Sequence, residues 1–180
     1  MPDDSRSHSS PVGAGGRRVS GRELSALHAE AYRWALHLSD YNSTEAEEMV
    51  QTAYLRILDG SARFRGEAAL KTWLFGIIRN VVRETRRKRY REVPLDESYA
   101  ANILGSEGVD DPTESRQIKT AIDQLPTRQR EVALLVFFRD LSIAEAAEVL
   151  GLTLGTARTH YERAKQNLAK ELKDLIDEND

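Results

Sequence analysis

Basic side chains are concentrated in one short stretch of this chain, where their spacing could hold phosphate groups. Residues 79–91 carry seven arginines and lysines and one acid, Glu84. Residues 92–114 follow directly and carry seven acids and no base. The two blocks cancel in the net charge of −3 but not in space. Charge asymmetry of this kind indicates a nucleic-acid partner.

The spacing of these cations places several of them on one face of a predicted helix. Arg79, Arg83 and Arg87 recur every four residues, and Asn80 lies beside them. Phe64 precedes this helix, and cations next to an aromatic side chain suit single-stranded nucleic acid, whose bases can stack. An ordinary solvated helix face is the alternative, and these residues alone leave both interpretations open.

A second group of polar side chains lies near the C-terminus, on the outer face of another predicted helix. Its members are Arg158, Thr159, His160, Glu162, Arg163 and Gln166. Arginine and threonine suit base-edge readout in duplex DNA, and a glutamate can accept a hydrogen bond from a cytosine amino group. The alternative is again a solvated surface helix, but the turn before this helix favours DNA.

That turn belongs to a predicted helix-turn-helix. Leu125 and Pro126 separate two helices, and the apolar run 132–138 predicts a buried segment. Ser142 and Glu145 predict a capping box at the start of a short helix. Gly151 suits a left-handed helix end, and Thr153 suits the N-cap of the next helix. A short helix, a glycine turn and a longer helix form the unit that places its second helix in the major groove.

Apolar spacing predicts helices in the N-terminal half as well. One stripe consists of Ala46, Met49, Val50, Ala53, Tyr54, Ile57 and Leu58. Thr44 with Glu47 predicts a capping box before this stripe, and Asp59-Gly60 predicts its end. Further helices are predicted across residues 24–38 and 70–82. Because no segment alternates with a period of two, we predict an all-α fold.

Composition predicts the division of the chain and excludes several function classes. We expect a disordered tail (1–20), a helical domain (21–91), a flexible acidic linker (92–114), a second helical domain (115–174) and a C-terminal tail (175–180). The chain has no cysteine and four scattered histidines, which argues against disulfides and zinc sites. No acid–base or nucleophile constellation indicates an enzyme, so we expect no catalytic residue and no cofactor. No apolar run approaches the roughly 18 residues of a membrane span.

The two helical blocks together resemble region 2 and region 4 of the extracytoplasmic-function (ECF) sigma factors, in the sigma-70 superfamily. The matching segments are residues 45–51, 64–67, 71–80, 125–132, 141–151 and 155–158. The resemblance implies a two-domain, all-α transcription initiation factor. Its implied partners are core RNA polymerase, promoter DNA and an anti-sigma factor that holds it inactive.

The resemblance also implies a role for individual residues. Residues that dock on the coiled coil of the polymerase β′ clamp are Glu47, Glu48, Gln51 and Leu55. Residues that melt and read the −10 element are Phe64, Asn80, Arg83, Arg86, Arg87 and Lys88. An aromatic, an amide and several cations placed together are what binding of a flipped base requires. Residues that read the −35 element are Arg158, Thr159, Glu162 and Arg163. Region 4 is also expected on the β flap.

Other classes of protein remain as alternatives. A sigma mimic would bind an anti-sigma protein without touching DNA, but it should lose the basic face that this chain retains. A plain helix-turn-helix repressor or response-regulator output domain would not need the block at residues 45–91. We expect a cytoplasmic bacterial protein without membrane insertion of its own, which an anti-sigma factor could hold at the membrane.

Overall fold

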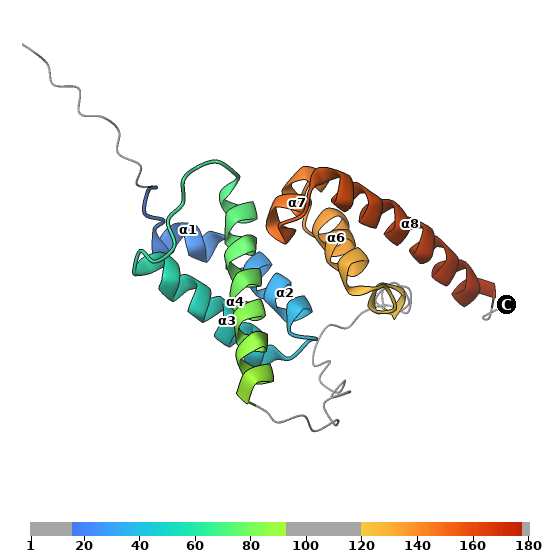
Figure 1. The fold of residues 1–180 in the computed structure, drawn as a ribbon, viewed down its shortest axis with the longest axis horizontal. Helices are drawn as coiled ribbons and strands as arrows, with labels where there is room; N and C mark the ends of the chain where they lie inside the picture. The colour runs from blue at the N-terminus through green and yellow to red at the C-terminus, as the bar shows by residue number, and fades with distance from the viewer. Residues whose placement is uncertain (1–15, 93–119, 178–180) are drawn as a thin grey trace, which may run out of the picture.

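The computed structural model describes residues 16–92 and 120–177, and these residues fold into two groups of helices (Figure 1). The helices are α1 (Gly21–Ala26), α2 (His28–Leu38), α3 (Ser43–Leu58), α4 (Leu70–Glu92), α6 (Thr127–Phe138), α7 (Ile143–Leu150) and α8 (Leu154–Asp177). Within these ranges no β-strand forms, so the all-α prediction is confirmed. Residues 1–15 of the predicted tail, 93–119 around the predicted linker, and 178–180 lie outside the described residues.

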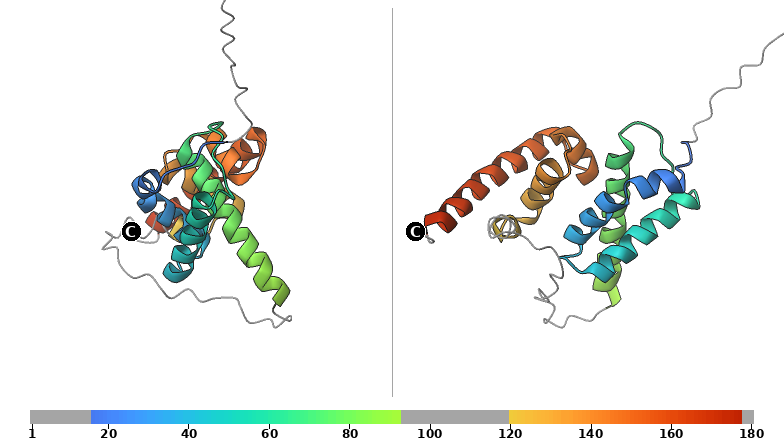
Figure 2. Two further views of the ribbon diagram at one scale, coloured as in Figure 1. Left: turned by 90° about the vertical axis from the view of Figure 1, so that its left-hand side faces the viewer. Right: turned by 180° about the vertical axis from the view of Figure 1, so that it is seen from behind.

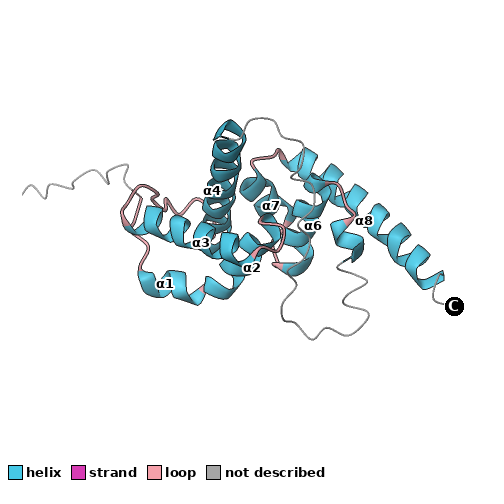
Figure 3. Cartoon of the chain, turned by 90° about the horizontal axis from the view of Figure 1, so that it is seen from below, coloured by secondary structure: helices cyan, strands magenta, loops and turns pink. Residues whose placement is uncertain are grey.

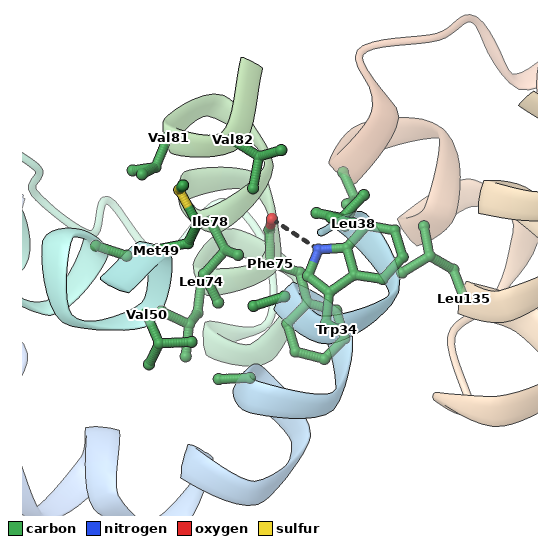
Figure 4. Close-up of a cluster of buried hydrophobic side chains, with 14 of the residues drawn as sticks. Trp34, Leu38, Met49, Val50, Leu74, Phe75, Ile78, Val81, Val82 and Leu135 are labelled. Carbon is green, nitrogen blue, oxygen red and sulfur yellow. Dashed lines mark hydrogen bonds between the residues drawn. The ribbon is translucent and has the colours of Figure 1, made fainter. Parts of the chain in front are cut away.

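The N-terminal domain is built from α2, α3 and α4, which pack against one another, with α1 leading into α2 (Figure 2). Trp34 of α2 is fully buried, and its indole Nε1 donates a hydrogen bond to the Phe75 carbonyl at 3.2 Å (Figure 4). The predicted apolar stripes supply this core through Met49 and Val50 of α3 and Leu74 of α4. The sequence pattern therefore predicted the buried face of α3 apart from its end. In α4 it predicted Leu74, Ile78, Val81 and Val82, but it left out Phe75, which is also fully buried.

Three predicted boundaries differ from the structure. Asn42, rather than Thr44, caps α3, and its side chain accepts from the Glu45 amide at 3.0 Å. Asp40 and Tyr41 have positive φ angles of 49° and 63°, so a tight turn ends immediately before Asn42. The helix predicted across residues 24–38 divides at Leu27 into α1 and α2.

The third difference concerns the start of the domain, which lies before residue 21. Ser20 forms a capping box with Glu23 at the start of α1. Val19, one residue earlier, is only 4% exposed and belongs to the core. Residues 16–20 of the predicted disordered tail are therefore part of the folded domain.

The C-terminal domain contains the predicted helix-turn-helix in α7 and α8. Ser142 and Glu145 form the predicted capping box, and Gly151 ends α7 in the left-handed region with φ 60°. The Thr153 hydroxyl accepts from the Thr156 amide at 3.2 Å, as expected of the N-cap of α8. Helix α6 packs on both of these helices. Each of these local predictions is confirmed.

The two domains pack against each other, with α7 lying between α4 and α8 (Figure 3). Leu135 of α6 belongs to the same hydrophobic cluster as Trp34 and Phe75 (Figure 4). Polar contacts also cross the boundary. The Thr72 hydroxyl donates to Glu145 at 3.3 Å, and the guanidinium Nε of Arg79 lies 3.6 Å from Glu131. Beside the turn after α2, the Tyr41 hydroxyl donates to Asp123 at 3.5 Å and Arg130 lies 3.7 Å from Asp40. A single apolar core thus continues from one domain into the other.

Among the helices formed by the described residues, none has the length and apolarity that crossing a bilayer requires.

Candidate nucleic-acid and polymerase interfaces

Helix α4 presents an exposed basic face beyond the contact between the domains. All five predicted −10 residues on this helix are exposed: Asn80, Arg83, Arg86, Arg87 and Lys88. They lie on the last four turns of a long helix whose opposite face, with Ile78 and Val81, fills the core. The cations and the amide are therefore held in fixed register by the packing of α4, and they face solvent.

Some arginines of the same stretch are also engaged within the protein. Arg86 donates to the Leu38 carbonyl at 2.5 Å and pairs with Asp40 at 3.0 Å, so it caps the end of α2. Arg89 pairs with Glu45 of α3 at 2.5 Å. The side chain of Arg86 nevertheless remains 49% exposed, so the predicted DNA contact would come in addition to these internal contacts.

Arg79 lies at the contact between the domains rather than on the exposed face that its spacing predicted. Its side chain is 4% exposed, and burial lowers the pKa of this guanidinium, while Glu131 opposes that shift. Arg79 is buried where α7 packs on α4 and where Glu131 of α6 approaches it. The helical period of the sequence cannot predict that a residue is buried by an element some 50 residues farther along the chain.

Glu84, the one acid of the basic stretch, has an internal partner. Its carboxylate accepts from Arg56 of α3 at 2.6 Å, and this hydrogen bond lowers the pKa of Glu84. The acid therefore ties α4 to α3, and the exposed face of α4 stays basic.

Phe64 lies in the loop between α3 and α4, and its ring is too enclosed for a base to stack on it. It is 7% exposed, and its ring centroid lies 5.4 Å from that of Trp73. The guanidinium of Arg17 lies over the same ring, 5.0 Å from its centroid. Asn80 is exposed and Phe64 is covered, so the two residues that the prediction joined around one flipped base differ in accessibility.

The outer face of α8 carries the predicted −35 residues, and all four of them are exposed. They are Arg158, Thr159, Glu162 and Arg163. The inner face buries Ala157 and Ala164 completely. The Thr159 hydroxyl donates to the Gly155 carbonyl at 3.0 Å, which leaves its oxygen able to accept.

The negative charge of Glu162 on this face is paired. Its carboxylate lies 2.9 Å from the ammonium of Lys165, and this hydrogen bond raises the pKa of Lys165. The pair reduces the repulsion that an unpaired carboxylate would exert on DNA phosphates.

The outer face of α3 carries the predicted polymerase-docking residues. Glu47, Glu48 and Gln51 are exposed, and Leu55 is 66% exposed. Leu58, which the apolar stripe placed in the core, is 50% exposed and extends this face. Two exposed leucines following exposed acids form a mixed polar and apolar surface, which is typical of a protein-binding site.

The sequence pattern also missed a second exposed apolar surface. Phe137 and Phe138 end the run that was predicted to be buried, yet they are 43% and 44% exposed. The ring of Phe137 packs on Tyr161 at 5.4 Å. The neighbouring helices therefore cover the end of this run only in part, and apolar content alone does not indicate how far that cover extends.

Within residues 16–92 and 120–177, no cluster of histidine, aspartate and glutamate could hold a metal ion.

Comparison with known families matches both halves of the chain. The model of Sigma-70 region 2 matches residues 24–92, and that of Sigma-70, region 4 matches residues 115–168. The chain is 36% identical over 137 residues to the ECF RNA polymerase sigma factor EcfG of Rhodopseudomonas palustris (strain TIE-1), which covers 76% of this chain and 75% of that relative. It is 32% identical over 183 residues to the ECF RNA polymerase sigma factor SigM of Mycobacterium tuberculosis (strain ATCC 35801 / TMC 107 / Erdman), with 88% of each chain covered.

A solved structure supports the same relationship. The sigma factor RpoE of Bartonella quintana, crystallised in complex with the anti-sigma factor NepR, matches with a TM-score of 0.65 and 29% sequence identity. The match covers 84% of this chain and 95% of that one.

Proposed function

The chain belongs to the ECF family of RNA polymerase sigma factors, and from that premise we propose that it binds core RNA polymerase and selects promoters by reading DNA on two surfaces. Region 4 would read the −35 element as duplex through α8. Region 2 would hold the melted −10 element through α4 and the loop before it. Catalysis would remain with the polymerase.

The observation that carries this proposal is the presence of two separate exposed polar faces on one chain. The face of α4 offers Asn80 and Arg83 with two further cations, which suits the phosphates and bases of a single strand. The face of α8 offers Arg158 and Arg163 beside hydrogen-bonding side chains at the N-terminal turns of a recognition helix. A helix-turn-helix regulator needs only the second face.

Docking on core polymerase would use the outer face of α3. Glu47, Glu48 and Gln51 would bind basic side chains, and Leu55 would add apolar contact, on the coiled coil of the β′ clamp. The exposed phenylalanines at the end of α6 are a further apolar surface on region 4, which we propose to sit on the β flap.

Regulation by an anti-sigma factor is part of the same proposal. It is supported by the RpoE structure, in which a sigma factor of the same fold is bound by NepR. We infer that an anti-sigma protein also binds this chain and holds it away from polymerase.

One set of contacts favours the second candidate, a sigma mimic that binds an anti-sigma protein without DNA. Arg79 is buried, and Arg86 and Arg89 are paired internally, so part of the basic stretch is already neutralised. The two functions differ in whether the remaining exposed cations contact DNA phosphates.

Single-strand binding by the holoenzyme separates the two candidates. Core polymerase with the full chain should bind single-stranded DNA sequence-selectively, with a log–log salt slope of about −0.7 per neutralised phosphate. Arg83→Ala with Arg87→Ala should flatten that slope, while Arg22→Ala, which removes an exposed cation from α1, should not. If the holoenzyme binds no single strand while the chain captures an anti-sigma protein, the mimic is correct.

A further inference from the structure

The segment before the first helix lies alongside the loop that contains Phe64. Residues 16–19, here named the N-terminal strap, run antiparallel to this loop, and a β-bridge joins Arg17 to Phe64. A side chain at Gly16 would not fit, because a Cβ atom there would lie 2.6 Å from the Phe64 carbonyl oxygen. Val19 anchors the other end of the strap in the core. The strap is thus fixed at both ends.

Arg17 is held above Phe64 by two further contacts. Its guanidinium lies over the Phe64 ring, and its Nη2 atom pairs with Glu23 at 2.8 Å. The hydrogen bond from Arg17, with smaller contributions from the amide and hydroxyl of Ser20, lowers the pKa of Glu23 to about 2. Despite these contacts, the Arg17 side chain is 51% exposed. Phe64 and Glu23 therefore fix the orientation of the guanidinium, while its outer face remains open to solvent.

Arg17 is consequently the outermost group at the place where the family resemblance puts an aromatic. Phe64 is 7% exposed beneath Arg17 and Trp73, so a base cannot reach its ring in this arrangement. Uncovering the ring would move the Arg17 guanidinium off it and separate the ion pair with Glu23. A base that approaches the loop meets the guanidinium first.

We propose that Arg17 is itself a single-strand-binding residue, on which an unpaired base of the melted promoter stacks while Phe64 supports the guanidinium from beneath. This inference rests on the proposed function of region 2. Guanidinium planes stack on bases as aromatic rings do, and the charge adds a cation–π contribution. Exposed Arg18, Arg63 and Arg65 surround the position and would attract the strand backbone.

The test is a cycle of protein and DNA changes on the holoenzyme. The full chain, wild type or Arg17→Ala, is assembled with core polymerase, and binding is measured to the non-template strand of a promoter on which it initiates. The same strand is then tested with one abasic site at each position in turn. If one base stacks on Arg17, Arg17→Ala should weaken binding about fivefold to tenfold, and the abasic site at that position should cost nothing further in the variant.

Two matched variants separate stacking from charge and from folding. Arg18→Ala removes an equal charge one residue away and should weaken binding to every abasic strand alike. Arg17→Lys keeps the charge without the planar group, so it should retain the salt slope but still lose the position-specific effect. Thermal unfolding of each variant confirms that the strap stays folded.

The proposal is overturned if Arg17→Ala behaves like Arg18→Ala. It is also overturned if Arg17→Ala weakens binding by the same factor on the intact strand and on every abasic strand. Either result would make Arg17 a general electrostatic contact without base stacking, and the proposed function of region 2 would stand. If the wild-type holoenzyme binds no single strand at all, the function of region 2 fails and this inference fails with it.

Discussion

On α8, contacts within the helix determine which side chains remain available to bind DNA. Lys165 neutralises Glu162, and the Thr159 hydroxyl donates back to its own helix. Arg163 lies between these residues and is exposed, with its five donors in a planar fork. A bidentate contact to guanine is the contact that such a fork makes best.

Replacing Arg163 should reduce both affinity and selectivity for duplex DNA. Arg163→Ala should cost about 1–3 kcal/mol and relax preference at one position of the −35 element. The measurement is binding of the holoenzyme to a library of duplexes varied at that element. Lys170→Ala, an exposed cation farther along α8, is the control that should leave selectivity unchanged. An equal loss on all sequences would make Arg163 a phosphate contact instead.

At the scale of helices and turns, local signals in the sequence predicted most of what the structure shows. The capping box at Ser142, the left-handed Gly151 and the N-cap at Thr153 depend on residues within four positions, and all three are confirmed. The predicted cap of α3 was wrong by two residues because the turn at Asp40 and Tyr41 precedes it, and a tyrosine rarely adopts the positive φ that this turn requires.

Burial that depends on another element could not be predicted in this way. Phe137 and Phe138 belong to an apolar run but are only partly covered by the neighbouring helices, whereas Arg79 belongs to a charged run and is buried beside Glu131 of α6. The enclosure of Phe64 depends on the strap, which composition assigned to a disordered tail. Each of these errors concerns a partner distant in sequence.

Two glycines on different elements should respond to the same substitution with opposite signs. Gly151→Ala should lower the free energy of unfolding by about 1–2 kcal/mol, because φ 60° is strained for a residue with a Cβ. Gly76→Ala, inside α4 with no atom within 4 Å of the new Cβ, should raise it by about 1 kcal/mol. Urea unfolding of the two variants measures both. A stabilised Gly151→Ala variant would contradict the turn described here.

The outer face of α3 should account for polymerase binding. Glu48→Arg with Gln51→Ala should abolish association with core polymerase while leaving unfolding unchanged, because both side chains are exposed and contribute little to the core. Glu148→Arg, an equivalent charge reversal on the exposed face of α7, is the control for non-specific charge effects. Undiminished co-purification of the double variant with core polymerase would refute the assignment.

At the scale of the whole molecule, the two domains share a core and a buried ion pair. Arg79 and Glu131 meet there with side chains that are 4% and 13% exposed, and Arg128 adds a second contact to Glu131 at 2.8 Å. Thr72 and Leu135 lie at the same contact, and Asp40 with Arg130 forms a more exposed ion pair across it. The structure is therefore a closed arrangement in which α4 contributes to both the contact between domains and the proposed DNA surface.

Removing the carboxylate at this contact should open the molecule. Glu131→Gln leaves the buried Arg79 without its counter-ion, at a cost of about 3 kcal/mol. Small-angle X-ray scattering should then show a larger radius of gyration. Arg79→Met with Glu131→Leu removes both charges and should restore the compact form, since an apolar pair of similar volume replaces a buried ion pair well. A Glu131→Gln variant as compact as the wild type would show that the ion pair does not hold the domains together.

Run-off transcription from a promoter library by core polymerase and the full chain tests the central claim most directly, because it requires polymerase docking and both DNA surfaces at once. The library varies two blocks of sequence upstream of a fixed start region. The expected result is initiation on a small subset of templates that share one sequence in each block at a constant separation, and none with the Glu48→Arg and Gln51→Ala variant. Transcripts no more selective than those of core polymerase alone, from a chain that still binds core, would contradict the claim.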